Sequence, residues 1–592
     1  MAVCVPPLTK CYSSEERREM FKNKDDWWTS DRYAFNLAMM VTAILIVVII
    51  VQSLKYIAST KRVMAMMRRS GSGGGGSLQA SVVSAINRIA ASARALHYHR
   101  FRIRNFYFPH TFPMILLSAI FIGTTVWAFT IFPYYRPGIQ FGPGPLAIRT
   151  GWMTLGLIPP VFSMGSRINP ISFITGISHE RLIDYHQYGA IIILFLSLVH
   201  TIPFIVEPLQ QGYEMGGGIE LGRFLLQKYY DGTVPFWNGI PPLVALVWIV
   251  VSSMKIFRNM MSYEFFVCQH IMTTFFFLVW MFIHTDVTYP QTWQYLFVTV
   301  GVMAWSWFGK ILVAFWANEF SYYNAQVATH PGEIIRIRIV TPLRWKAAQC
   351  IYIRFLTISP LESHPFTITS IPSNDVHSTS NVLQLILRGK SGITRKLNDK
   401  AKGGVASIPV LIDGPYGGIP RPLNGFSHVL LLSGGTGVTS NISVLLTLLN
   451  QMERSETLVE QIDFVWVVRE MHSLEWFNDT FKALSTYSSF GNVNLVIHVT
   501  GQNELDEKSS SSGLAYDEKL YNFVKGRPNV KRIVRDSAKQ AQGKHLAVVV
   551  CGLGGLFNFD TMNECAAVEF QMALGNQALP NQMFVHSESF EW

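Results

Sequence analysis

The sequence predicts a multi-domain membrane protein, in which a bundle of transmembrane helices is followed by a folded part outside the membrane. Apolar segments of membrane-spanning length recur up to about Ala325 and then stop, and the composition beyond that point is typical of a mixed globular protein. Of the 592 residues, 49% are hydrophobic and 13% are aromatic, which is high for a soluble protein.

Seven apolar segments form the predicted bundle. They lie near residues 34–55, 112–133, 148–165, 184–206, 241–257, 263–285 and 292–317. Between the first two, the stretch from Lys55 to Arg104 carries many Lys and Arg and no Asp or Glu, so the positive-inside rule places this loop in the cytoplasm. Seven spans then put the N-terminus outside and everything after Lys310 in the cytosol. The positive charge therefore indicates topology, and we expect no binding to nucleic acid.

The basic loop contains two recognisable stretches. Residues 71–77 have the sequence Gly-Ser-Gly-Gly-Gly-Gly-Ser, which is typical of a flexible linker and also of an engineered replacement for a native loop. Residues 78–97 combine apolar residues with Arg and Ser at helical spacing. Either a basic amphipathic helix on the inner membrane surface or a solvated connector would have this pattern.

Two pairs of histidines lie in the fourth and sixth apolar segments. His186 and His200 are fourteen residues apart, and so are His270 and His284. On a helix this spacing separates two side chains by about 21 Å along the axis and only about 40° around it. Both helices are predicted to run from the cytoplasm outward. His186 and His270 would then form an inner pair, and His200 and His284 an outer pair.

Four histidines at matched spacing favour two haem sites over simple packing roles. Two imidazoles per iron leave no open position, which suits electron transfer rather than oxygen binding. A proton relay would need a chain of acids or hydroxyls, and no acid lies between the histidines of either pair. Zinc would need ligands in one coordination sphere, whereas ligands about 21 Å apart serve separate centres.

Beyond His330 the sequence predicts two further folded regions. Short strand patterns indicate a small antiparallel barrel, at residues 333–340, 350–356, 366–371 and 382–387. From Ser427 the order changes to strand, glycine turn and helix, which predicts an open parallel sheet. Its expected strands are 428–432, 462–468, 494–499 and 546–551, with a helix at 441–449.

The turn Gly434-Gly-Thr-Gly437 follows a buried strand and opens a helix, where backbone N–H groups can approach a pyrophosphate. Arg469 follows the next strand, and Arg527 lies in Gly526-Arg-Pro-Asn529. Either arginine could meet the 2′-phosphate that distinguishes NADPH from NADH. Because hydride carries two electrons and a haem accepts one, we expect a flavin between the nicotinamide and the haems.

Several motifs lie in order along the second half of the chain. They are His364-Pro-Phe-Thr367, Lys390-Ser-Gly-Ile-Thr394, Asp413-Gly-Pro-Tyr-Gly417, Gly434-Gly-Thr-Gly437, Trp466-Val-Val-Arg469, Gly526-Arg-Pro528, Cys551-Gly552 and His586-Ser-Glu-Ser-Phe-Glu-Trp592. Together with the histidine pairs, this set resembles the ferric reductase and NADPH oxidase superfamily, and in particular the fungal cell-surface iron and copper reductases. The resemblance extends over roughly residues 110–592.

The resemblance implies that a ferredoxin-reductase-like module follows the membrane domain. Hydropathy and charge predict an extracellular segment 1–33, a first span 34–56 and a basic cytoplasmic loop 57–111. Over the rest of the chain, the implied regions are a six-span haem-binding domain 112–320, an FAD-binding antiparallel barrel 321–420 and an NADPH-binding α/β domain 421–592. Residues implied to bind FAD are His364, Pro365, Phe366, Thr367, Gly392, Thr394 and an aromatic cover for the flavin ring, which is either Phe590 or Trp592. Residues implied to bind NADPH are Gly434, Gly435, Thr436, Gly437, Arg469, Arg527, Cys551 and Gly552. Ser440 stands where many relatives have proline, and we expect little consequence.

The resemblance implies an NADPH-dependent ferric-chelate reductase. Electrons would pass from cytosolic NADPH through FAD and two b-type haems to extracellular ferric or cupric chelates. The first alternative is a superoxide-generating NADPH oxidase with the same electron path, and the second is a transporter or haem-binding signalling protein with a degenerate flavin domain. The expected location is the plasma membrane, with the vacuolar membrane as the alternative. The expected partners are the lipid bilayer, the metal chelates and metal transporters.

Overall fold

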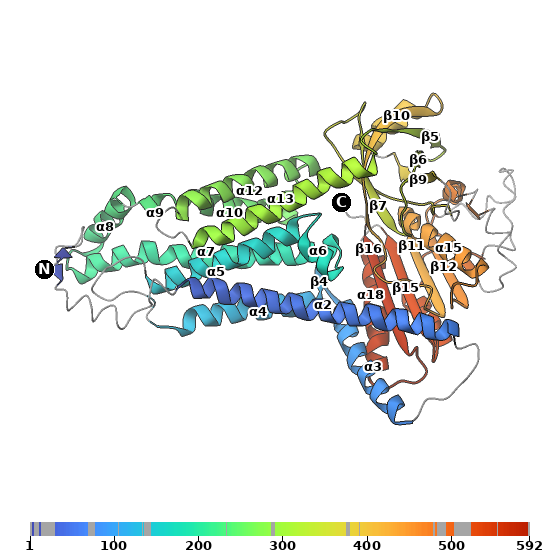
Figure 1. Cartoon of the computed structure of the whole chain (residues 1–592), viewed down its shortest axis with the longest axis horizontal. Coiled ribbons are helices and arrows are strands. Elements are labelled where there is room, and N and C mark those ends of the chain that lie inside the picture. Colours follow the sequence, from blue (N-terminus) through green and yellow to red (C-terminus); the bar gives the residue numbers. More distant parts are fainter. Residues whose placement is uncertain are drawn as a thin grey trace. The chain divides into compact units, whose positions relative to one another are not determined.

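The computed structural model describes most of the chain and divides it into two compact units (Figure 1). The described residues are 3–4, 11–12, 30–68, 77–104, 106–132, 134, 144–232, 234–285, 291–373, 379–389, 391–477, 480–481, 493–501, 522–552 and 555–589. Unit 1 comprises residues 1–52 and 113–309, and unit 2 comprises residues 53–112 and 310–592. Of the predicted linker 71–77, all but Ser77 lies outside the described residues.

Unit 1 is helical, and helices occupy all seven predicted apolar segments. They are α2 (Asp31–Arg68), α4 (Thr111–Thr130), α5 (Pro145–Gly165), α7 (His179–Glu214), α10 (Ile240–Ser253), α12 (Tyr263–Thr285) and α13 (Thr292–Ala317), with the shorter α6 (Pro170–Thr175), α8 (Gly218–Gly232), α9 (Val234–Trp237) and α11 (Lys255–Arg258) between them. Within the described residues, α2, α4, α7, α12 and α13 are long and apolar enough to cross a membrane. Helix α10 is apolar but shorter.

Two helix pairs build the centre of unit 1, since α5 packs against α7 and α10 packs against α12 (Figure 1). Most residues of α5 are buried, among them Trp152, Met153 and Ile158. A helix with most of its residues buried, including the polar Arg149 and Thr150, lies inside a bundle rather than at its surface. Helix α5 therefore presents a protein-facing surface to α7 along most of its length.

The first part of unit 2 is the predicted antiparallel barrel. Its strands are β5 (Tyr323–His330), β6 (Ile334–Thr341), β7 (Gln349–Phe355), β8 (His364–Thr367), β9 (Asn381–Arg388) and β10 (Ala406–Gly417), in the order β8-β7-β10-β5-β6-β9. A bridge between Ile368 and Leu385 connects the two edges of this sheet. Helix α14 (Gly392–Ala401) lies between β9 and β10 in the chain. The barrel prediction is confirmed, although β5 and β10 were not anticipated.

The second part of unit 2 is the predicted open parallel sheet. Its strands are β11 (His428–Gly434), β12 (Gln461–Val468), β13 (Val493–Val499), β14 (Asn522–Lys525), β15 (His545–Gly552) and β16 (Gln582–Ser589), and its helices are η2 (Gly435–Gly437), α15 (Val438–Glu453), η3 (Met471–Phe477), α17 (Val530–Gln540) and α18 (Leu556–Ala573). The order β14-β13-β12-β11-β15-β16 reverses direction between β11 and β15. Ligands of such sheets bind at this reversal, beyond the carboxyl ends of the strands.

Unit 2 also contains a segment from the N-terminal part of the chain. The predicted helix is confirmed as α3 (Ser77–Tyr98). It is followed by a hairpin of β3 (Arg100–Ile103) and β4 (Phe106–His110). Helix α3 packs against α18 of the parallel-sheet domain (Figure 1). The buried face of α3 lies against protein, which differs from a solvated connector, whereas a position at the membrane surface stays a prediction.

Candidate functional site

The four histidines of unit 1 face one another in the two predicted pairs. His186 and His200 lie on α7, and His270 and His284 lie on α12. The ring centres are 6.3 Å apart in the pair His186–His270 and 6.2 Å apart in the pair His200–His284. The fourteen-residue spacing therefore produces two separate sites along the two helices.

The α7 histidines are held by main-chain carbonyl groups of α5. Nδ1 of His186 donates to the carbonyl oxygen of Val161 at 2.8 Å, and Nδ1 of His200 donates to that of Ala147 at 2.7 Å. A carbonyl can only accept, so Nδ1 carries the proton and Nε2 keeps its lone pair. Metal-ligating histidines are usually oriented in this way by a bond from the second ring nitrogen.

Two glycines of α5 allow this close approach. A Cβ atom at Gly151 would lie 2.8 Å from Nδ1 of His200, and one at Gly165 would lie 2.7 Å from Nδ1 of His186. Each glycine follows the accepting carbonyl by four residues, so it occupies the next turn on the same face of the helix. Sequence reasoning missed both glycines. The available signal was their spacing, because Gly151 and Gly165 are also fourteen residues apart.

The α12 histidines are held by side chains instead. Nδ1 of His284 lies 3.0 Å from Oδ1 of Asn238, whose Nδ2 donates to the carbonyl oxygen of Ile283 at 3.2 Å. Nδ1 of His270 lies 3.3 Å from Oγ of Ser253, a longer contact. Asn238 is 1% exposed, so this amide is committed to the protein interior. Neither side chain was singled out from the sequence.

The separation within each pair would allow one metal ion to be held between the two rings. A metal bonded at about 2 Å to one nitrogen of each ring, with about 1.1 Å from each nitrogen to its ring centre, separates the centres by about 6 Å. The two observed separations match this value. All four rings use Nδ1 for a protein contact, which leaves Nε2 for the metal.

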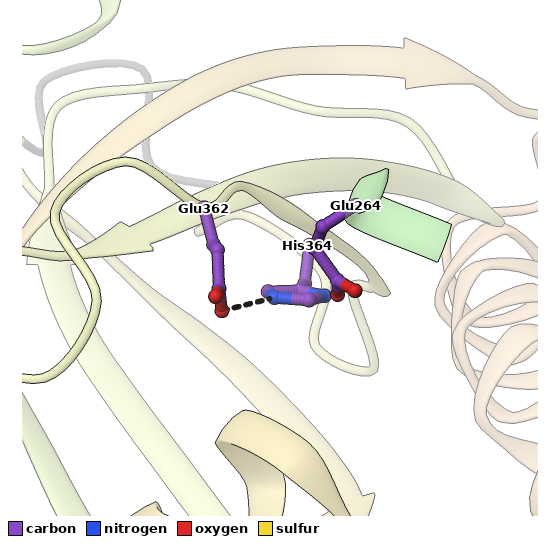
Figure 2. Close-up of side chains that lie close together, drawn as sticks. All are labelled: Glu264, Glu362 and His364. Atoms are coloured by element: carbon purple, nitrogen blue, oxygen red, sulfur yellow. Dashed lines mark hydrogen bonds and ion pairs between the residues drawn. The ribbon is translucent and has the colours of Figure 1, made fainter. Parts of the chain in front are cut away.

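The predicted flavin residues lie on β8 and at the start of α14. His364, Pro365, Phe366 and Thr367 form β8, which pairs with β7. Nε2 of His364 lies 3.4 Å from Oε2 of Glu362 (Figure 2). A hydrogen bond from Ser359, and then one from His364, hold the pKa of the Glu362 carboxyl below its usual value.

At the other predicted flavin element, Gly392 opens α14 with a φ of +53°, a conformation that favours glycine. No atom lies within 4 Å of the position where a Cβ of Gly392 would stand. The Thr394 hydroxyl donates to the carbonyl oxygen of Ser391 at 2.8 Å, within the first turn. This helix N-terminus is open, as binding of a pyrophosphate would require.

The glycine turn and the end of β15 come together at the reversal of the parallel sheet. Gly434 ends β11, and Cys551 and Gly552 end the adjacent β15. A Cβ at Gly437 would lie 2.4 Å from the carbonyl oxygen of Cys551, so only glycine fits there. Nε1 of Trp466 on β12 donates to the carbonyl oxygen of Gly435 at 3.0 Å, and this bond fixes the position of the turn.

The two predicted phosphate-reading arginines share the same edge of the sheet. Arg469 follows β12 and Arg527 follows β14 and Gly526, and both side chains are exposed. The carboxyl ends of parallel strands meet at one edge, so both arginines follow their strands at the edge of the sheet where the glycine turn lies. Strand β12 neighbours β11, whereas β14 is the edge strand. Thr436 lies within the turn itself and is half-buried.

The two candidate flavin-covering aromatics, Phe590 and Trp592, lie outside the described residues. The strand that precedes them, β16, is described, and it ties the C-terminal segment to the glycine-turn helix. Oγ of Ser440 donates to Oε2 of Glu588 at 3.0 Å, and Nε2 of His586 lies 3.0 Å from Oε1 of Glu588. Ser440, for which we expect little consequence, therefore has a hydrogen-bond partner on β16.

Three family models match the chain in the order of its domains. A ferric reductase like transmembrane component matches residues 150–281, an FAD-binding domain matches residues 319–419, and a ferric reductase NAD binding domain matches residues 426–566. These matches cover α7, α12 as far as residue 281, the barrel and most of the parallel-sheet domain, so His284 lies just beyond the first match.

Individual relatives include both reductases and oxidases. A probable cell surface ferric reductase of Aspergillus oryzae is 28% identical over 467 residues, which are 75% of this chain and 61% of that protein. A ferric/cupric reductase transmembrane component of Saccharomyces cerevisiae is 27% identical over 385 residues, 63% of this chain and 58% of that protein. A superoxide-generating NADPH oxidase heavy chain subunit of Dictyostelium discoideum is 24% identical over 476 residues, 74% of this chain and 90% of that protein. The chain thus spans about 60% of the length of the two fungal reductases.

Proposed function

Because this chain belongs to the ferric reductase and NADPH oxidase superfamily, we propose that it is a transmembrane metalloreductase. It passes electrons from NADPH through FAD and two bis-histidine b-type haems to ferric or cupric chelates on the other side of the membrane. When bound, FAD supplies the conversion of a hydride into single electrons, and the haems supply one-electron redox centres.

The observation that carries this proposal is the duplicated histidine geometry. Each pair has its Nδ1 atoms engaged and its ring centres 6.3 or 6.2 Å apart. His186 and His270 hold the inner haem, and His200 and His284 hold the outer one. Two histidine nitrogens at each site would leave no iron position open to the acceptor, which suits electron transfer rather than binding of the acceptor to iron.

In unit 2, the residues of β8 and the start of α14 bind the flavin, and the glycine turn with Cys551 and Gly552 binds the dinucleotide. The close approach of Gly437 to the Cys551 carbonyl brings the turn and the end of β15 together. The N-terminus of α15 begins at this turn, where its N–H groups and positive dipole end favour a phosphate. Arg469 or Arg527 pairs with the 2′-phosphate of NADPH.

The topology we propose has the N-terminus outside and the barrel and parallel-sheet domains in the cytosol of a plasma-membrane protein. The support is the basic stretch from Lys55 to Arg104, which has no acid to offset its positive charge. Similarity to a probable cell surface ferric reductase favours the plasma membrane over the vacuole.

An anaerobic reductase assay tests the proposed function. Purified protein with FAD and haem receives NADPH and a ferric chelate in the absence of oxygen, and in a parallel aerobic reaction with superoxide dismutase. Reduction that continues under both conditions supports direct electron transfer to the metal. Loss of reduction under either condition identifies superoxide as the carrier and supports the oxidase, which the similarity to the Dictyostelium subunit makes the rival.

The choice of dinucleotide is tested at Arg527. Losing a charge-assisted bond to a phosphate weakens binding by roughly tenfold or more, so Arg527→Ala raises the KM for NADPH and leaves that for NADH nearly unchanged. Arg532→Ala is the matched control, because Arg532 is an exposed arginine on α17 that pairs with Asp536. Equal changes for the two dinucleotides would remove Arg527 from the phosphate site.

A further inference from the structure

Helix α3 belongs to the chain between α2 and α4, yet one face of it is part of the core of the parallel-sheet domain. Ala91, Ala95 and Tyr98 are buried, and Ala91 and Tyr98 lie in the same apolar cluster as Val585 of β16. Their spacing places them on one side of the helix. The Tyr98 hydroxyl also accepts a hydrogen bond from the backbone N–H of Val585 at 3.2 Å.

An ion pair lies at the centre of this contact. Nε and Nη2 of Arg94 donate to Oε1 and Oε2 of Glu569 at 2.6 and 3.0 Å, in a two-bond arrangement. The Glu569 side chain is 0% exposed and that of Arg94 is 22% exposed. Burial raises the pKa of the Glu569 carboxyl to about 7, and the Arg94 guanidinium opposes this rise. Burying a carboxylate this deeply destabilises the fold unless a cation pairs with it. The ion pair with Arg94 therefore favours the packing of α3 on α18.

The hairpin that follows α3 extends the contact along α18. The backbone N–H of Arg100 donates to Oδ1 of Asn563 at 2.8 Å, and Nδ2 of Asn563 donates back to the carbonyl oxygen of Arg100 at 3.2 Å. The rings of Tyr107 and Phe559 lie 5.4 Å apart. Three successive elements, α3, β3 and β4, therefore each contribute a specific contact to one helix.

We propose that α3 and the β3–β4 hairpin, which lie in the chain between candidate spans α2 and α4, form a strap that fastens the NAD(P)-binding domain to these two spans through the ion pair of Arg94 with Glu569. The chain also enters the barrel from the membrane unit through α13, so the strap is a second attachment. A second attachment raises the effective concentration of the domain near its electron acceptor without any change in the domain's own site. Only this effect on the rate of electron transfer depends on the proposed function, because the packing of α3 does not.

The strap predicts that two steps of the reaction respond differently to Arg94→Ala. Full-length protein loaded with FAD and haem is mixed with NADPH in an anaerobic stopped-flow instrument, and flavin and haem absorbance are followed separately. Losing a buried ion pair shifts a docking equilibrium by more than a factor of about ten. Haem reduction therefore slows by at least about tenfold, while flavin reduction stays within about twofold because it occurs inside unit 2. Arg94→Lys, which keeps the charge, recovers part of the haem rate.

Arg535→Ala is the matched control for this experiment. It removes another ion pair to the same helix, between Arg535 of α17 and Glu564 of α18 at 2.5 Å, that does not involve α3. Both steps should keep their wild-type rates in this variant. Unchanged haem reduction in Arg94→Ala would overturn the strap, and so would an equal loss of both steps, since that would indicate damage to the domain.

Hydrogen exchange provides a readout that does not depend on the reaction. Backbone amides of residues 91–98 should be protected in the wild-type protein and in Arg535→Ala, and should exchange at least about tenfold faster in Arg94→Ala. Rapid exchange of these amides in the wild type would overturn the strap. If the wild type instead shows this protection but no reduction of haem by NADPH, the proposed function fails and the strap stands.

Discussion

Helices α7 and α12 present equivalent histidines, but the protein holds the two sets by different means. The α7 rings donate to main-chain carbonyls of α5 at 2.8 and 2.7 Å. The α12 rings meet the side chains of Ser253 and Asn238 at 3.3 and 3.0 Å. A carbonyl contact depends on the path of the backbone and on a glycine nearby, whereas a side-chain contact can be altered by one substitution.

At each proposed haem site, the two kinds of contact would affect different properties of the histidines. The α5 carbonyls would fix the position of His186 and His200 at the two proposed sites, since a helix backbone cannot move without disturbing its own hydrogen bonds. The α12 partners set the strength of the bond to the other ligand, because the acceptor at Nδ1 governs the basicity of Nε2. Substitutions on the two sides should therefore affect haem retention and haem potential to different extents.

The largest expected effect comes from removing a ligand. His200→Ala should lower metal reduction by at least about a hundredfold, since losing a proposed iron ligand has a larger effect than losing the group that hydrogen-bonds to that ligand. Reduction of the flavin by NADPH should remain normal, because it takes place in unit 2. Stopped-flow absorbance and a chelate assay measure the two steps. Near-normal metal reduction would remove His200 from the electron path.

The hydrogen bonds between the α7 histidines and α5 should be disrupted by adding a methyl group to α5. In Gly151→Ala the new Cβ would lie 2.8 Å from Nδ1 of His200, and overpacking of this kind costs about 1–3 kcal/mol. The outer site should lose haem, as measured by the ratio of haem to protein. Gly165→Ala should do the same at the inner site. Gly123→Ala on α4, where no atom lies within 4 Å of the added Cβ, should retain both haems.

Asn238 tests the side-chain contacts of the α12 histidines. Asn238→Ala removes the acceptor from Nδ1 of His284, which lowers the basicity of the ligand and should raise the midpoint potential of the outer haem by tens of millivolts, on the order of one factor of ten in the equilibrium. Asn238→Asp, a stronger acceptor, should shift the potential in the opposite direction. Spectroelectrochemical titration measures both. Shifts of the same sign in the two variants would contradict this assignment.

The smallest effect is expected at Ser253, because its contact with His270 is the longest of the four. Ser253→Ala should raise the inner-haem potential by less than Asn238→Ala raises the outer one. The same titration resolves the two haems. An inner-haem shift as large as the outer one would show that the distances in the structure do not rank the two contacts.

Much of the candidate site could be predicted because its signals are local. The spacing of His186 and His200 follows from helix geometry, and the turn from Gly434 to Gly437 follows from its position between a strand and a helix. Asn238 could not be predicted, because it lies 46 residues from His284 in the sequence and nothing local links the two. The carbonyls of Ala147 and Val161 are harder still, since any residue has a carbonyl.

The sequence by itself determined the apolar spans, the charge of the loop from Lys55 to Arg104, the two histidine pairs and the order of the nucleotide motifs. Each of these depends on the period of a helix or strand, or on residues close together in the chain. The tertiary structure alone decided which ring nitrogen is free, why α5 carries glycines opposite the histidines, and where α3 packs. These depend on contacts between distant segments, and the hydrophobic effect that drives such packing has no direction that a sequence pattern could record.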